Sequence, residues 1–446
     1  MITKGILIYI SLFLFLFFNA IIISFIPADY VPYAVTPYIG LLLISFLIDP
    51  LALLRSKSGY LLYSSFLILH IILLAYYGYR QDFDSVLNLS ALIAAYLGSY
   101  SITTAAAQFV KPYDLLRSLL SICLPLLVIA MFLSIVMTFI GSPIAPPYYP
   151  WEALFSEKRL LILSYTTDSD RIVGHSIAIW LAGFALIDQL AKRGTLTIRG
   201  LLIMSFLVVV LLLSKTRTGL MLILLPSFAI FLARKTRVRP KTLAILLSII
   251  PATYFLISPN TNVALKISDA ILAAQQLATP LRIYGSDDIK VSAFTNRDLL
   301  NQSLYESLYH APITGIGDGA PILNFGINYH GNIADESGFD RIAGSESGLR
   351  IVVKYGLIYT FILALIAFFP FYRSECIMES SVKWPEKNWI LTIGFGYYAL
   401  LVVAMLDGVF ENPKGSSAFF FIFLFLLWQI AREAYEIPIS DSPSYP

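Results

Sequence analysis

Residues 198–241 read IRGLLIMSFLVVVLLLSKTRTGLMLILLPSFAIFLARKTRVRPK. Two apolar runs, 198–214 and 219–233, enclose a short hairpin that carries Arg217, and five basic residues follow the second run. Runs of this length approach the thickness of the hydrocarbon core of a bilayer, which is roughly 30 Å. The stretch therefore predicts two membrane-spanning helices joined at one membrane surface.

The same pattern recurs along all 446 residues, of which 58% are hydrophobic and 13% are charged. Soluble proteins carry roughly 25% charged residues, so this composition indicates a membrane protein. We predict an all-α polytopic fold with about 12 transmembrane helices and one long, partly helical periplasmic loop. The predicted spans are 5–26, 35–54, 60–79, 86–108, 117–141, 172–191, 198–214, 219–233, 242–258, 347–371, 389–407 and 415–431.

The basic residues of the short loops determine the predicted orientation, because loops that stay in the cytoplasm are enriched in lysine and arginine. One set of loops holds seventeen of the 31 basic residues, and the short loops of the other set hold four. Those four are Arg80, Lys215, Arg217 and Lys414. We therefore expect a multi-pass protein of the cell inner membrane with both termini in the cytoplasm, and we interpret the first run as a span, not a removable signal peptide.

Two predicted outer segments are long, and the longer one divides the chain into three parts. Residues 1–258 would form spans one to nine, 259–346 a periplasmic loop domain, and 347–446 the last three spans and a cytoplasmic tail. A segment this long between spans is usually a folded functional element. We expect two helices in this segment. The first, at about 262–277, is amphipathic. The second starts near Thr295 with a capping-box pattern and ends at Pro312.

Arg171, Arg217 and Arg297 all fall on the predicted outer face, against the usual charge bias. Cations beside a bilayer are costly there unless they hold something anionic. Each arginine also has an ordinary interpretation: a solvated loop residue, a side chain that reaches lipid headgroups, or a salt bridge to a neighbouring aspartate. Since the guanidinium fork suits phosphate oxygens, three together indicate a site for a lipid-linked phosphate or diphosphate.

Other residues of the outer segment supply candidate bases. His330 and Glu346 are the two that we select as candidates to accept a proton from a sugar hydroxyl, although each is also an ordinary loop residue. The four histidines are scattered without metal-ligand spacing, and the one acidic pair with such spacing, Asp168-Ser-Asp170, is a weak indication, so no metal is expected. The net charge of +3 is too small to indicate nucleic acid. His70 lies inside an apolar run and is expected to pack between helices through hydrogen bonds.

The stretch Pro312-Ile-Thr-Gly-Ile-Gly-Asp-Gly319 is rich in glycine, which is a weak indication of phosphate binding. It lacks the Lys-Ser/Thr that follows in a P-loop, so we reject a nucleotide site. We expect these glycines to form a tight turn where the backbone closely approaches another chain segment or a substrate.

Four short motifs occur in order on the predicted outer face and resemble those of the O-antigen ligase and polymerase superfamily. They span about residues 165–375. The motifs are Arg171-Ile-Val-Gly174, Leu213-Ser-Lys-Thr-Arg217-Thr-Gly-Leu220, Asn296-Arg297 through Pro312-Ile-Thr-Gly-Ile-Gly317, and Ser345-Glu-Ser-Gly-Leu349 through Lys354-Tyr-Gly-Leu357.

The resemblance implies a membrane glycosyltransferase that takes a glycan from an undecaprenyl-diphosphate carrier on the periplasmic face, with no cofactor or metal. By motif position, Arg171, Arg217 and Arg297 would bind the diphosphate. Ligases of this family have a His-Asn pair where this chain has Gly344-Ser-Glu-Ser347, which favours a polymerase over an O-antigen ligase acting on lipid A–core. A flippase for the same lipid-linked glycans stays open as another class, and so does a partner protein that regulates chain length.

Overall fold

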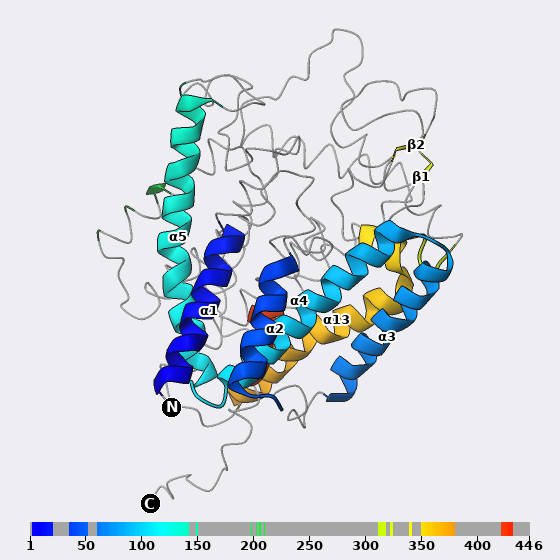
Figure 1. Cartoon of the computed structure of the whole chain (residues 1–446), viewed down its shortest axis with the longest axis horizontal. Coiled ribbons are helices and arrows are strands. Elements are labelled where there is room, and N and C mark those ends of the chain that lie inside the picture. Colours follow the sequence, from blue (N-terminus) through cyan, green and yellow to red (C-terminus); the bar gives the residue numbers. More distant parts are fainter. Residues whose placement is uncertain are drawn as a thin grey trace, which may run out of the picture.

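The computed structural model describes residues 2–20, 35–51, 60–141, 311–317, 322–323, 339–340, 349–379 and 421–430, with isolated positions at 149, 198, 202, 205, 206 and 209. Figure 1 shows these parts as a group of long helices. Their bounds are α1 Ile2–Ala20, α2 Thr36–Ile48, α3 Tyr60–Tyr79, α4 Phe83–Ala106, α5 Pro112–Ile140, α13 Leu349–Glu379, and a further helix at Phe421–Ile430.

Seven of the twelve predicted spans coincide with these helices, so a helical fold is confirmed for the described part of the chain, apart from one pair of two-residue strands. The other five spans fall largely outside it. By length and composition one described helix, Phe83–Ala106, can cross a membrane, and the remaining apolar stretches that the structure describes are shorter. The number of spans therefore stays a prediction.

The described part of the outer segment adds one small feature that the sequence did not predict. Strands β1 Ile322–Leu323 and β2 Phe339–Asp340 have two residues each and pair antiparallel, with Ile322 opposite Asp340 and Leu323 opposite Phe339. The pairing joins two parts of the chain on either side of His330.

Helices α2 and α4 cross at close range because a glycine lies at the contact. A Cβ atom added to Gly98 would lie 2.4 Å from the carbonyl oxygen of Tyr38. Further along the interface, the hydroxyl oxygens of Ser45 and Ser101 are 2.7 Å apart. Small residues that let backbones approach, with hydroxyl hydrogen bonds between helices, are typical of helix packing in membranes.

Contacts between helix pairs also determine their relative directions. The contacts of α2 with α4 pair Tyr38 with Gly98, Ser45 with Ser101 and Asp49 with Gln108, so these helices run parallel. Lys4 at the start of α1 donates to the carbonyl oxygen of Ile48 at the end of α2, 2.8 Å away, so α1 and α2 run antiparallel. Figure 1 shows α5 rising beside α1.

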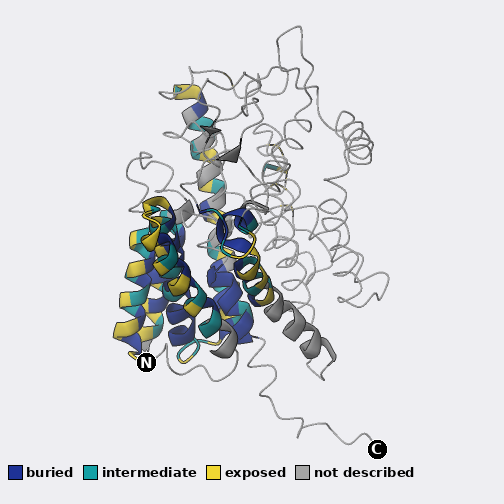
Figure 2. Ribbon diagram, turned by 90° about the vertical axis from the view of Figure 1, so that its right-hand side faces the viewer, coloured by how far each residue is buried: buried dark blue, intermediate teal, exposed yellow. Residues whose placement is uncertain are grey.

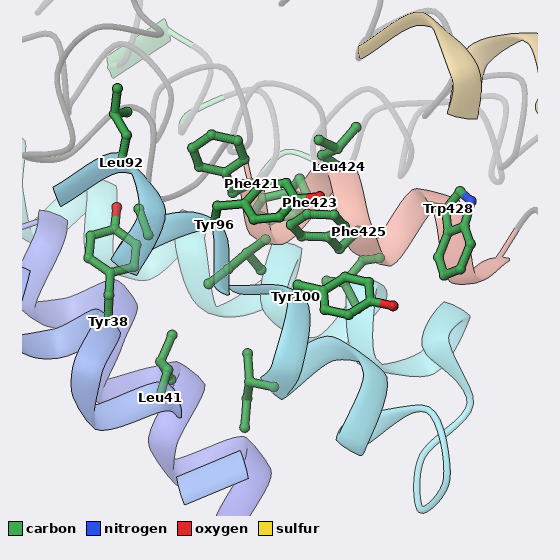
Figure 3. Close-up of a cluster of buried hydrophobic side chains, with 14 of the residues drawn as sticks. Tyr38, Leu41, Leu92, Tyr96, Tyr100, Phe421, Phe423, Leu424, Phe425 and Trp428 are labelled. Atoms are coloured by element: carbon green, nitrogen blue, oxygen red, sulfur yellow. The ribbon is translucent and has the colours of Figure 1, made fainter. Parts of the chain in front are cut away.

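Aromatic side chains join α4 to the helix at Phe421–Ile430 (Figure 3). The ring of Phe425 meets those of Tyr96 and Tyr100 edge-on, with centroids 5.3 and 5.2 Å apart. Phe421 meets Tyr96 in the same way at 5.9 Å. Because these pairs advance along both helices together, this helix also runs parallel to α4.

Helix α3 packs antiparallel to α13 through the one buried histidine of the described residues. His70 is 1% exposed, and its Nδ1 lies 2.9 Å from the carbonyl oxygen of Phe66. The Tyr359 hydroxyl lies 3.0 Å from His70 Nε2. A tautomer with its proton on Nδ1 satisfies both contacts, since Nδ1 then donates and Nε2 accepts. The expectation that His70 packs between helices through hydrogen bonds is confirmed.

Large apolar side chains are exposed along the outer sides of these helices as well as buried between them (Figure 2). On α1, Phe13 and Leu14 are 40% and 57% exposed, and on α2, Leu47 is 74% exposed. A helix that is apolar on all sides is typical of a protein core or a membrane span.

The α2–α4 crossing gives a first prediction. We expect Gly98→Ala to lower the free energy of unfolding by about 1–3 kcal/mol, because the added methyl group overlaps the Tyr38 backbone. Gly40→Ala on α2 is the matched control, since a Cβ there meets nothing within 4 Å. Thermal or denaturant unfolding in detergent would measure both variants. Equal unfolding curves for the two would contradict the close crossing.

Candidate functional site

All five residues that the sequence selects for the site lie outside the described residues. These are Arg171, Arg217, Arg297, His330 and Glu346. The described part of the chain neither brings them together nor separates them. It does include the glycine-rich stretch at 311–317 and the start of α13, and these two segments belong to the last two of the four motifs.

The two segments contact each other directly through their backbones. The amide of Ile316 donates to the carbonyl oxygen of Val353 at 2.8 Å, and the amide of Gly317 donates to that of Lys354 at 3.0 Å. In return, the amide of Leu357 donates to the carbonyl oxygen of Pro312 at 2.8 Å. We call residues 311–317 and 353–357 together the glycine clasp.

The clasp exists because α13 is interrupted at Gly356, which has φ 84° and ψ 172°. In a continuous α-helix the amide of Leu357 would donate to the carbonyl oxygen of Val353, four residues earlier. At the interruption this hydrogen bond is exchanged for two others, because Leu357 donates to Pro312 and Val353 accepts from Ile316. Both backbone groups keep a partner, so the break leaves neither of them unsatisfied.

Three glycines make this approach of two backbones sterically feasible. A Cβ at Gly315 would lie 2.1 Å from the carbonyl oxygen of Lys354, and one at Gly356 would lie 1.9 Å from that of Ile313. A Cβ at Gly317 would lie 2.1 Å from Oδ2 of Asp82. All three have positive φ, which glycine adopts without steric cost. The expectation that the glycines of 312–319 turn where the backbone approaches another chain segment is confirmed for Gly315 and Gly317, and Gly319 lies outside the described residues.

Helix α3 contributes a side chain that bonds to both halves of the clasp. The hydroxyl of Tyr77 lies 2.6 Å from the carbonyl oxygen of Thr314 and 2.6 Å from that of Lys354. Tyr77 is 0% exposed, and its ring meets the ring of Tyr76 edge-on at 5.2 Å. The one hydroxyl proton is therefore shared between two acceptors on different chain segments.

The turn between α3 and α4 completes the surroundings of the clasp. Asp82 caps α4, because its Oδ1 accepts a hydrogen bond from the amide of Ser85 at 3.1 Å. The hydroxyl of Ser85 donates to the other carboxylate oxygen at 2.6 Å. These bonds hold the Asp82 carboxylate against Gly317, where a side chain would otherwise fit.

Two cations lie near this end of the bundle in different surroundings. Lys354 is 4% exposed, although ammonium groups are buried only where charge or hydrogen bonds compensate them. Arg80 is exposed, and its guanidinium carbon lies 5.7 Å from the centre of the Tyr76 ring, within cation–π range.

Among the described residues, no three or more His, Cys, Asp or Glu side chains could together hold a metal ion.

Sequence reasoning did not select Tyr77, Asp82 or Gly356 for the site. The sequence does indicate a structural role for Asp82, because an aspartate just before an apolar run is a typical helix N-cap. Gly356 lies inside a quoted motif, but nothing in the run predicts that the helix is interrupted there. Tyr77 cannot be distinguished from Tyr76 or Tyr79 by sequence, since only the fold brings it to the clasp.

The contacts of the clasp are backbone hydrogen bonds, and they fix residues 311–317 against α13. No protein-family model matches this chain, and no curated protein matches its sequence.

The clasp gives a second prediction. We expect Gly315→Ala to detach residues 311–317 from α13, because the added methyl group would overlap the Lys354 carbonyl group. Cleavage of the outer segment by a protease should then become at least several-fold faster in the detergent-purified protein. Gly78→Ala on the neighbouring α3 is the control, because a Cβ there meets nothing within 4 Å. Unchanged cleavage of Gly315→Ala would show that the contact is dispensable for docking.

Proposed function

We propose that this protein is an integral membrane glycosyltransferase that polymerises polyprenyl-diphosphate-linked oligosaccharide repeat units on the periplasmic face, without a metal ion. The observation that carries the proposal is the glycine clasp. Two of the four motif segments that resemble the O-antigen ligase and polymerase superfamily are in direct contact through three backbone hydrogen bonds. Contact between separate motifs is what a shared site requires.

The relative directions of the helices support the same proposal. The predicted topology has α1, α3 and α5 running outward and α2, α4, α13 and the helix at Phe421–Ile430 running inward. Each direction that the described contacts determine agrees with this alternation. In that topology, the clasp, the α3–α4 turn and the start of α13 all lie at the outer face.

Packing and exposure support a membrane location. Helix α4 has 24 residues, and at a rise of 1.5 Å per residue it is about 36 Å long, enough to cross a hydrocarbon core of roughly 30 Å. The exposed apolar sides of α1, α2 and α3 fit a hydrocarbon solvent. We therefore retain twelve spans, a periplasmic loop domain at 259–346 and cytoplasmic termini as parts of the proposal.

The proposed reaction is a single displacement at the anomeric carbon. A hydroxyl oxygen of the acceptor glycan forms the new bond to this carbon as the bond to the carrier diphosphate breaks, with inversion of configuration. The bonding electrons pass to the diphosphate, which Arg171, Arg217 and Arg297 would neutralise, and Glu346 or His330 would accept the hydroxyl proton. Fixed cations lower the barrier because negative charge grows on the leaving group in the transition state.

The ligase alternative differs in the acceptor only, and the replacement of the His-Asn pair by Ser345-Glu346-Ser347 favours the polymerase. Purified protein supplied with both lipid-linked oligosaccharide and lipid A–core would separate the candidates. Longer lipid-linked chains support a polymerase, and transfer to lipid A–core alone supports a ligase. Movement of the lipid without any new glycosidic bond would overturn both and indicate a flippase.

The arginines give a third prediction. We expect Arg217→Ala and Arg297→Ala each to lower the turnover number about 100-fold or more, since one lost transition-state contact costs roughly 2.7–4 kcal/mol. Arg237→Ala, on a predicted inner loop, is the control and should leave turnover unchanged. Immunoblots of membranes would verify equal protein levels. Normal glycan length in both outer arginine variants would reject the proposed site.

The topology gives a fourth prediction, which uses two exposed positions at opposite ends of described helices. After Cys123 and Cys376 are replaced by serine, Tyr79→Cys should react with a membrane-impermeant maleimide in spheroplasts, and Lys111→Cys should not. Tyr79 is 89% exposed and Lys111 is also exposed, so burial does not limit either reaction. Labelling of Lys111→Cys before the membrane is permeabilised would contradict the orientation.

A further inference from the structure

We infer that Tyr77 is a positioning residue for the proposed glycosyl transfer, because its hydroxyl fastens the outer segment to both α3 and α13. The inference rests on the proposed function, but the docking itself is measurable without any activity. Tyr77 lies on α3, outside all four motifs, and has no role in the proposed chemistry.

The first step of the argument is that the Tyr77 hydroxyl has little freedom to move. The ring is 0% exposed and lies edge-on against Tyr76. Gly317 approaches it so closely that an added Cβ would lie 2.9 Å from ring atom Cε1. A tyrosine has only two rotatable side-chain bonds, and here both are restricted by packing. The oxygen is therefore held at one point relative to α3.

The second step is that this point joins both chain segments. Thr314 O and Lys354 O lie at equal distances of 2.6 Å from the hydroxyl. The Lys354 carbonyl also accepts from the amide of Gly317, so it would keep one partner without Tyr77. Without the hydroxyl, the Thr314 carbonyl would lose its bond to Tyr77 on α3, and only the backbone hydrogen bonds of the clasp would hold the two segments in register.

The third step is that a shift at the Tyr77 hydroxyl would displace the chain segments that carry the candidate site residues. Thr314 follows Arg297 by seventeen residues, through the helix predicted to close at Pro312, and Lys354 follows Glu346 by eight. The Tyr77 hydroxyl thus fixes one end of each segment that carries a candidate group. A misplacement of about 1 Å far from the chemistry can lower a rate about 100-fold.

The test removes the hydroxyl and nothing else. Tyr77→Phe keeps the ring and its packing, and Tyr79→Phe is the matched control, because Tyr79 is 89% exposed on the same helix. We expect Tyr77→Phe to lower kcat about 10-fold to 100-fold, with the KM for the lipid-linked donor within about twofold. We expect Tyr79→Phe to match the wild-type protein in both constants.

A covalent tie distinguishes positioning from general stabilisation. Ile316→Cys with Val353→Cys joins the two segments where a backbone hydrogen bond of 2.8 Å already links them. With Cys123 and Cys376 replaced by serine, oxidation should restore most of the turnover of Tyr77→Phe, and reduction should remove it again. A disulfide also stabilises a fold in general, so the unfolding temperature is measured alongside, and a lower value for Tyr77→Phe than for Tyr79→Phe would indicate a purely structural effect.

The contact between the two segments can be measured without a substrate. We expect the introduced cysteines to form their disulfide several-fold more slowly in Tyr77→Phe than in the protein with Tyr77, because the segments are less well aligned. Equal disulfide rates together with a kcat like that of Tyr79→Phe would overturn the inference. If the protein with Tyr77 forms no glycosidic bond, the proposed function fails, and the disulfide rates still decide whether Tyr77 docks the segment.

Discussion

The arrangement of the described chain depends on one constraint: a backbone amide or carbonyl group shielded from water must find a partner within the protein. Helix α13 would satisfy this rule by itself if it were continuous, yet it is interrupted at Gly356. The interruption persists because the glycine-rich segment exchanges hydrogen bonds with Leu357 and Val353. The same exchange that repairs the helix also anchors the outer segment, so the two cannot be altered separately.

Close approach of backbones recurs at the α2–α4 crossing, where Gly98 lies against Tyr38 and the hydroxyl groups of Ser45 and Ser101 meet. In the bilayer location that we propose, apolar burial would supply no driving force between helices, because lipid tails are as apolar as leucine. Contact area and hydrogen bonds would then hold the helices together, and both increase when small residues bring the backbones close. Tyr77 shows the complementary role, since its large rigid ring lies directly against Gly317.

Apolar runs predicted the described helices well: α3 spans the predicted residues, and α2, α4 and α5 end within about six residues of their predictions. Physical chemistry explains this success, because length and composition alone determine such runs. The positions that depend on tertiary contacts could not be predicted. Gly356 lies in a run that would continue as a helix without the 311–317 segment. Tyr77 has tyrosine neighbours of equal propensity, and two strands of two residues leave no periodic pattern.

The pairing of β1 with β2 brings together the two ends of a stretch of fifteen residues, 324–338, that includes His330. When the two ends of a loop are held together, the residues between them tolerate insertions. Doubling the length of such a loop costs only about 0.6 kcal/mol in entropy. Evolution could therefore lengthen or rewrite this stretch without disturbing the helices. In the glycosyltransferase that we propose, changes between Leu323 and Phe339 would be a route to new sugar preferences, whereas a side chain at Gly315 or Gly356 would break the clasp.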